Sequence, residues 1–337
     1  MTRLTAVPIL LALASSASAA TLQVPADFPA IAGALAVASS GDTVLVSPGT
    51  YLEHDLVLPS GVVLLGDAAT PEHVVIDAAG QGRVLFGDGL AAGTEIGMLT
   101  LQGGATSGNG GGAILSGSFL LRDCVIEDCS ADGLGGGLRL QRGEVRRCLL
   151  TDNDAGAGGG LAIGNSDTAH VEDCVFAGNT ATIGGAAAST GFLTLVHCTL
   201  AFNTADRGGA VFYGGDSEIQ ARTLLDRCLV AFNMAASSSG GIDGWYSVGE
   251  APHIDFDCSD VFGNTPTEIV GGFPMADLIY SDPQFCPGAG EGRYPIADGS
   301  PCAPANSPCG ERIGAFDPAC ASTAVERRSW GAVKSLY

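Results

Sequence analysis

The stretch Leu195-Val196-His197-Cys198-Thr199-Leu200-Ala201-Phe202-Asn203, followed by Gly208-Gly209, decides the fold because its pattern returns along the chain. Copies run from Cys148 to Asn153, from Cys174 to Asn179 and from Cys228 to Asn233, and in each the asparagine lies five residues after the cysteine. The repeat cysteines are Cys124, Cys148, Cys174, Cys198, Cys228 and Cys258, so successive copies are 24, 26, 24, 30 and 30 residues apart. A fixed period in this range is the mark of a solenoid.

Each repeat carries short runs in which apolar residues alternate, as in Leu193, Leu195, Cys198 and Leu200. A period of two indicates β-strands, and the glycine pairs and asparagines between the runs suit tight bends. A repeat of about 24 residues with three short strands fits one turn of a right-handed, single-stranded parallel β-helix. The predicted fold class is therefore all-β, with a short N-terminal capping helix and a Cys-rich C-terminal cap.

Stacking of the turns, roughly 4.8 Å apart, predicts ladders of equivalent side chains. The six repeat cysteines would form one inward column. An amide ladder at a bend would consist of Asn153, Asn179, Asn203 and Asn233, with Asn264 as a further candidate. The residues before the cysteines would form an outward row of ion pairs made of Asp123, Arg147, Asp173, His197, Arg227 and Asp257. Exposed pairs of this kind stabilise by less than about 1 kcal/mol each, so a structural role is favoured for the row.

The chain divides into five predicted parts. They are a signal peptide (1–20), an N-terminal cap (21–41) with a helix over 28–39, the parallel β-helix (42–285), a Cys-rich C-terminal cap (286–320) and a linker with a C-terminal tail (321–337). The apolar run from Leu4 to Leu13 before Ala17-Ser18-Ala19 is typical of a secretory signal and is too short to span a bilayer. We therefore expect a secreted or cell-surface protein, or a periplasmic one, without a transmembrane helix in the mature chain.

The chain is strongly acidic, with 15 basic and 36 acidic residues and a net charge of −21. Such a surface argues against nucleic acid and against anionic membranes as partners. It is compatible with a polysaccharide or cell-envelope partner. We expect no cofactor apart from an optional Ca²⁺ ion.

Export to an oxidising compartment would allow the 11 cysteines to form disulfides. Cys286, Cys302, Cys309 and Cys320 lie beyond the repeats and are the disulfide candidates, and three pairings among them stay open. The column cysteines are interpreted as small core hydrophobes, with bridges between adjacent turns as the alternative.

Two groups of motifs resemble known families. Phe28-Pro29-Ala30-Ile31, the strand Gly41-Asp42-Thr43-Val44 and Pro48-Gly49-Thr50-Tyr51 with Glu53 look like the N-terminal cap and first turn of pectin-lyase-like right-handed β-helix proteins. The Gly-Gly-Ala and Phe-x-x-Asn phrases, such as Gly208-Gly209-Ala210 and Phe176 to Asn179, resemble the repeats of polymorphic outer-membrane proteins. The resemblance implies the fold but not the activity, because this fold carries lyases, hydrolases, esterases, adhesins and spacers.

The two 30-residue repeats hold extra residues, and these predict loops that carry the functional site. The candidates for substrate binding are Tyr213, Arg222, Trp245 and Tyr246. The candidates for acid–base catalysis are Asp243, His253 and Asp255. The structural alternative is that these aromatic residues only cover the flank of the solenoid.

The leading functional prediction is a non-catalytic module that binds polysaccharide or envelope, or supports it structurally. One alternative is a carbohydrate-active enzyme, a polysaccharide lyase or glycoside hydrolase, with its site on the loops of residues 213–222 and 243–257. Another is an adhesin-like surface protein. The complete polygalacturonase and pectin methylesterase signatures do not occur in the sequence.

Overall fold

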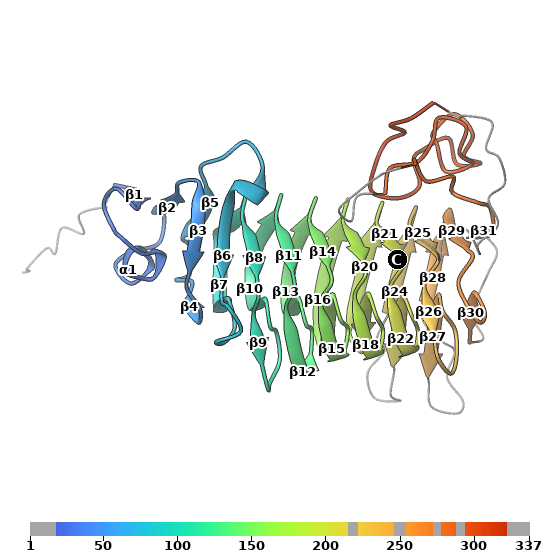
Figure 1. Cartoon of the computed structure of the whole chain (residues 1–337), viewed down its shortest axis with the longest axis horizontal. Helices are drawn as coiled ribbons and strands as arrows, with labels where there is room; N and C mark the ends of the chain where they lie inside the picture. The colour runs from blue at the N-terminus through green and yellow to red at the C-terminus, as the bar shows by residue number, and fades with distance from the viewer. Residues whose placement is uncertain (1–17, 215–221, 246–253, 272–277, 288–293, 322–337) are drawn as a thin grey trace, which may run out of the picture.

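The computed structural model describes residues 18–214, 222–245, 254–271, 278–287 and 294–321. They form a parallel β-solenoid of about nine turns, which confirms the predicted architecture (Figure 1). Within these ranges α1 (Ile31–Leu35) is the one α-helix and η1 (Pro71–His73) the one 3-10 helix. Residues 1–17 of the predicted signal peptide (1–20) and residues 322–337 of the predicted linker and tail (321–337) lie outside the described residues.

Three parallel sheets form the sides of the solenoid. The first contains β1 (Thr21–Val24), β2 (Thr43–Val46), β4 (Leu56–Val57), β5 (Val63–Gly66), β7 (Leu85–Gly97), β10 (Ala113–Arg122), β13 (Leu138–Arg146), β16 (Leu161–Glu172), β19 (Ala187–Ser189), β20 (Phe192–Val196), β23 (Val211–Gly214), β24 (Arg222–Asp226), β27 (Ile242–Trp245), β28 (Ile254–Asp257) and β30 (Ile269–Val270). The second contains β3 (Gly49–Leu52), β6 (Val74–Asp77), β8 (Thr100–Gln102), β11 (Val125–Glu127), β14 (Leu149–Thr151), β17 (Val175–Ala177), β21 (Thr199–Ala201), β25 (Leu229–Ala231), β29 (Ser259–Phe262) and β31 (Leu278–Ile279). The third contains β9 (Ala105–Thr106), β12 (Ser130–Leu134), β15 (Asp154–Ala157), β18 (Thr180–Ile183), β22 (Thr204–Arg207) and β26 (Met234–Ala235).

The inward cysteine column is present for five of the six predicted members. Cys124, Cys148, Cys174, Cys198 and Cys228 are buried and free. The last member was predicted wrongly, because Ser259 takes the inward position and its Oγ accepts the backbone N–H of Cys228 at 2.9 Å. Cys258 instead occupies the left-handed corner of its turn (φ 43°), which is the place of Arg227 one turn earlier (φ 51°). The outward row consequently ends at Cys258 rather than at Asp257. Asp257 lies opposite Asp226 in the register of β24 and β28.

The asparagine ladder runs through Asn153, Asn179, Asn203, Asn233 and Asn264. Each side-chain amide donates to the Oδ1 of the next asparagine, over 3.0, 2.9, 2.9 and 2.8 Å. The last amide donates to the carboxylate of Glu268 at 2.7 Å, so an acidic side chain terminates the ladder. Buried polar groups are thereby satisfied along the bend between the second and third sheets.

The N-terminal cap contains a strand as well as a helix. β1 pairs with β2, so the solenoid begins within the segment predicted as cap only, and α1 is shorter than the predicted helix over 28–39. Glu53 accepts the first free N–H groups of α1, from Ile31 at 2.7 Å and from Ala32 at 2.8 Å. A carboxylate at the start of a helix satisfies its unpaired donors. The helix thus covers the first turn at one end of the molecule (Figure 1).

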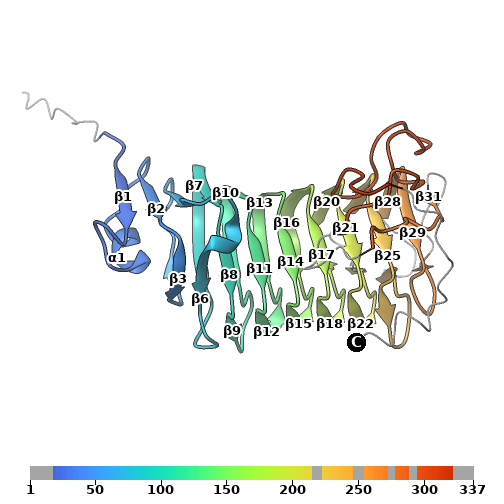
Figure 2. The same ribbon diagram turned by 45° about the horizontal axis from the view of Figure 1, so that its top comes forward.

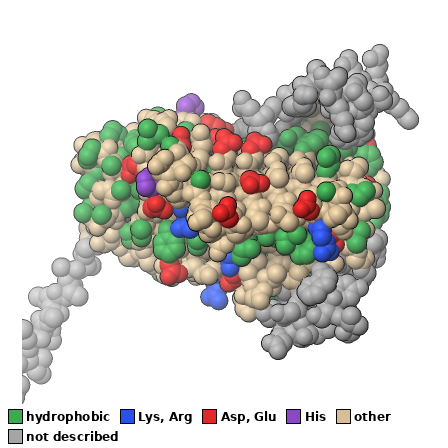
Figure 3. All heavy atoms as spheres, turned by 60° about the horizontal axis from the view of Figure 1, so that its bottom comes forward, with side chains coloured by type: hydrophobic (Ala, Val, Ile, Leu, Met, Phe, Trp, Pro, Cys, Tyr) green, Lys and Arg blue, Asp and Glu red, His purple; other side chains and the backbone are tan. Residues whose placement is uncertain are grey.

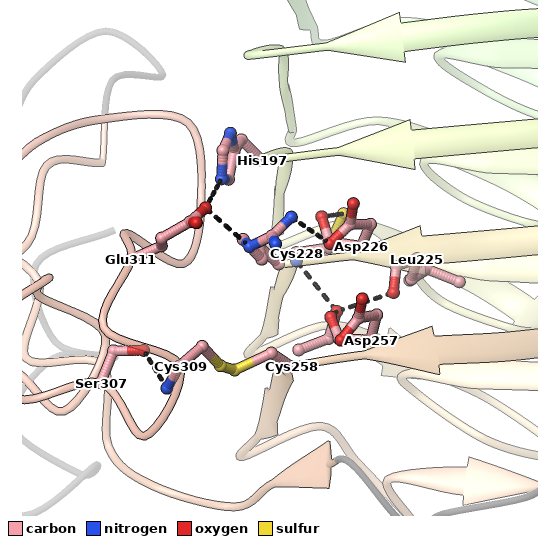
Figure 4. Close-up of a disulfide and its surroundings, with 11 residues drawn as sticks. His197, Leu225, Asp226, Cys228, Asp257, Cys258, Ser307, Cys309 and Glu311 are labelled. Carbon is pink, nitrogen blue, oxygen red and sulfur yellow. Dashed lines mark hydrogen bonds and ion pairs between the residues drawn. A yellow bond between two sulfur atoms is a disulfide. The ribbon is translucent and has the colours of Figure 1, made fainter.

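The described residues of the C-terminal cap, 286–287 and 294–320, lie along the side of the solenoid, over β21, β25 and β29 (Figures 1 and 2). Two disulfides hold it, Cys258–Cys309 to the solenoid and Cys286–Cys320 within the cap. Cys302, predicted as a disulfide partner, is a free buried thiol, and Cys258 takes its place in the pairing. The reason is the corner position of Cys258, which turns its side chain outward toward the cap (Figure 4).

Candidate functional site: a groove beside the C-terminal cap

One outward column of the second sheet leads to the site. The register aligns Thr100, Val125, Leu149, Val175, Thr199 and Leu229 on successive turns. The loop that carries η1 covers the start of this column, where the Thr100 hydroxyl donates to the Pro71 carbonyl at 3.2 Å. The cap covers its end, where the backbone N–H of Ala315 donates to Thr199 Oγ1 at 2.9 Å.

Between these two covers the column forms the floor of a groove of about 370 Å³. Thr100 and Thr199 are four turns apart, which corresponds to roughly 19 Å along the axis. Thr70 and Pro71 line one end, and Ala315 and Phe316 line the other. In Figure 1 the light-blue loop that carries η1 and the red cap both lie on the upper side of the solenoid. The floor is apolar because it consists of the aliphatic side chains of the column.

A row of charged side chains forms one edge of the groove. It consists of the left-handed corner residues Asp123, Arg147 and Asp173, joined by Arg312 of the cap. The Asp123 carboxylate accepts two hydrogen bonds from Arg147, at 2.7 and 2.8 Å. Arg312 binds Asp173. The charges of the groove are therefore neutralised in pairs, and the side chain of Arg147 remains 52% exposed.

The two carboxyls of this row have opposite electrostatic environments. Hydrogen bonds from Arg147 lower the pKa of Asp123. Burial raises the pKa of Asp173, although the charge of Arg312 acts in the other direction. Two carboxyls whose pKa values are driven apart are the arrangement that acid–base catalysis uses. They are two turns apart, about 10 Å between backbone positions.

The predicted loop site is not assembled as expected. Tyr213 is 2% exposed, because the alternation of β23 directs it into the core with Val211. Asp243 is fully buried and forms an ion pair with Arg207, over 2.8 Å from Oδ2 to Nε. Both side chains are therefore shielded from solvent, Tyr213 by packing in the core and Asp243 by burial in its ion pair with Arg207.

The remaining loop candidates are only partly placed. Arg222 and Asp255 form an ion pair across β24 and β28, and both are partly or largely exposed. Trp245 ends strand β27. Tyr246 and His253 lie outside the described residues. The loops therefore stay a candidate for binding, without the Tyr213 and Asp243 contributions.

The optional Ca²⁺ site has no counterpart among the described residues, where no three acidic, histidine or cysteine side chains are grouped so that they could hold a metal. The acidic side chains on the face shown in Figure 3 are scattered rather than gathered. The helices in the described part of the chain are too short to cross a membrane.

Sequence reasoning identified the charged row but not the groove around it. The positions of Asp123, Arg147 and Asp173 before the column cysteines were the available signal. The missing information was the position of Arg312, which lies 139 residues after Asp173 in the chain. No family model matches the chain, and no curated protein matches it.

Proposed function

We propose that the protein is a secreted or cell-surface module that binds a polysaccharide, or a similar extended envelope polymer, in the groove without cleaving it. The observation that carries this proposal is the combination of an apolar floor with a rim of paired charges. An apolar sugar face can pack on Leu149, while guanidinium and carboxylate groups hydrogen-bond to hydroxyls. Since the rim pairs are formed before the ligand arrives, little ordering is needed on binding.

The test is retention of the chain from Thr21 onward on a panel of neutral and acidic polysaccharides, with and without Ca²⁺, while chain cleavage is recorded in parallel. Arg147→Gln removes the exposed guanidinium of the rim and should weaken retention about tenfold or more. Arg146→Gln is the matched control, because Arg146 bonds Glu144 and Glu172 on the first sheet and does not line the groove. Equal retention of both variants, or a loss in Trp245→Ala alone, would contradict a site in the groove.

A second candidate is a glycoside hydrolase acting in the same groove. The opposite pKa shifts of Asp123 and Asp173 favour it. Asp173 would be the acid and Asp123 the base, at a spacing nearer to that of inverting pairs, roughly 6.5–9.5 Å between carboxyls. Cleavage that disappears in Asp173→Asn while retention persists would establish this function and replace the binding module.

A further inference from the structure

The cap forms one wall of the groove and therefore controls its shape. Arg312, Ala315 and Phe316 are the wall residues. This wall is joined to the buried side of the cap, because the backbone N–H of Ile313 donates to the Cys302 carbonyl at 3.0 Å. Ile313 and Cys302 are fully buried against Leu229 of the solenoid. Movement of Cys302 away from the solenoid would thus displace the wall.

Ion pairs connect the cap to the charged corners of the turns. Glu311 forms an ion pair with Arg227, 2.9 Å from Oε2 to Nε, and its carboxylate lies 4.0 Å from His197 (Figure 4). Arg312 binds Asp173 and lies 3.4 Å from Asp317. His197 also faces Asp173 at 3.9 Å. These pairs are partly exposed and therefore screened by solvent, so they do not dominate the docking.

A buried carboxyl lies under the cap. Asp260 extends the outward column one turn beyond Leu229 and is 0% exposed. It accepts the backbone N–H of Ser281 at 3.0 Å, and the Cys302 thiol donates to it at 3.1 Å. The other charged groups that act on it are the carboxylates of Glu268 and Asp282. None of these groups is a cation, so a negative charge on Asp260 is costly as long as the docked cap keeps it buried.

We propose that the cap is a pH-responsive wall of the groove, docked tightly in mildly acidic solution and loosened at neutral to alkaline pH, when Asp260 is ionised. The Cys258–Cys309 disulfide keeps the loosened cap tethered to the solenoid. The consequence for ligand binding rests on the proposed function, whereas the docking itself does not. The groove would hold its ligand in acid and release it as the pH rises.

The direction of the pH dependence follows from the proton that Asp260 takes up when the cap docks. Burial raises the pKa of Asp260 to about 6 in the docked state. An exposed aspartate has a pKa of about 3.9, so docking takes up a proton between about pH 4 and pH 6. The stabilisation of the docked state is complete below the pKa of the exposed aspartate. It is lost as the pH rises through the pKa of the docked Asp260. These two values predict a docking equilibrium about tenfold weaker at pH 8 than at pH 5.

The experiment measures the rate at which 4,4′-dithiodipyridine modifies Cys302 at pH 5 and pH 8, followed by mass spectrometry of the Cys302 peptide. Each rate is divided by that of the denatured chain at the same pH, which removes the intrinsic pH dependence of the thiol. We expect protection of Cys302 to fall about tenfold from pH 5 to pH 8. The core thiol Cys174, buried in the column, serves as the internal control and should stay protected at both pH values.

Asp260→Asn should abolish the pH dependence of Cys302 protection, whereas Asp298→Asn, an exposed carboxyl of the same cap, should keep it. Asp260→Ser provides a second neutral variant where the amide is not accommodated. Equal protection of wild-type Cys302 at both pH values, or modification of Cys302 and Cys174 at the same normalised rate, would overturn the proposal. The measurement uses no glycan, so a failure of polysaccharide binding leaves its outcome unaffected and counts only against the proposed function.

Discussion

At the scale of single residues, the asparagine ladder shows why one residue type recurs at one bend. Asn203 donates to Asn233 and to the Phe176 carbonyl, and its Oδ1 accepts from both nitrogens of Asn179. An amide is needed because it carries two donors and an acceptor on a short side chain. Aspartate would lack the donors, and a hydrophobic residue would lack both.

Asn203→Ala should therefore be strongly destabilising. The substitution removes the Oδ1 that accepts from the backbone N–H and from the side-chain amide of Asn179 in a fully buried place, and each donor left without an acceptor costs about 1–3 kcal/mol. We expect a loss of roughly 3 kcal/mol or more in the free energy of unfolding, measured by urea denaturation. Asn165→Ala, at an exposed position, should change it by less than about 0.5 kcal/mol. Similar losses in the two variants would contradict the ladder as a source of stability.

The residue scale also shows where prediction from sequence stopped. The period identified the cysteine column, but it could not choose between Cys258 and Ser259 for the last inward place, because both are small and adjacent. That choice depends on Cys309, which lies 51 residues later. Asp243 was predicted as a candidate for acid–base catalysis, and the sequence around it does not indicate that Arg207, 36 residues earlier, is its partner.

At the scale of elements, the cap is attached by two disulfides with different roles. Cys258–Cys309 closes 51 residues and connects the cap to the solenoid, while Cys286–Cys320 closes 34 residues within the cap. The entropy of loop closure gives nearly the same stabilisation for both, about 4 kcal/mol. Their effects on the docking of the cap should nevertheless differ.

The double variant Cys258→Ser/Cys309→Ser should release the cap, whereas Cys286→Ser/Cys320→Ser should leave it docked. The measurement is limited proteolysis at pH 8, followed by mass spectrometry of the excised segment. We expect cleavage within the cap to accelerate about tenfold or more in the first variant relative to the second, because the tether to the solenoid is lost only there. Equal acceleration would mean that the internal disulfide, rather than the tether, maintains docking.

At the scale of the whole molecule, the repeat made the architecture predictable, since each turn contacts mainly its neighbours and repeats the same local rules. The groove was not predictable in this way. Its floor follows from the repeat, but its two ends come from the loop of η1 and from the cap, which are not repeats. Such long-range covering leaves no periodic signal in the sequence.

The net charge of −21 gives a further expectation at this scale. Repulsion among acidic groups destabilises the compact state, and salt screens it over a Debye length that falls from about 30 Å at 0.01 M to about 3 Å at 1 M. Salt also weakens the surface ion pairs, but each of these is worth less than about 1 kcal/mol, so screening of the repulsion should dominate. We expect the melting temperature to rise by about 2–4 °C between 10 mM and 500 mM NaCl at pH 7.5.

CaCl₂ at the same ionic strength should give the same rise in melting temperature, and a larger rise would reveal a Ca²⁺ site. A fall in melting temperature with NaCl would mean that the ion pairs along the corner row and the cap outweigh the repulsion of the acidic surface.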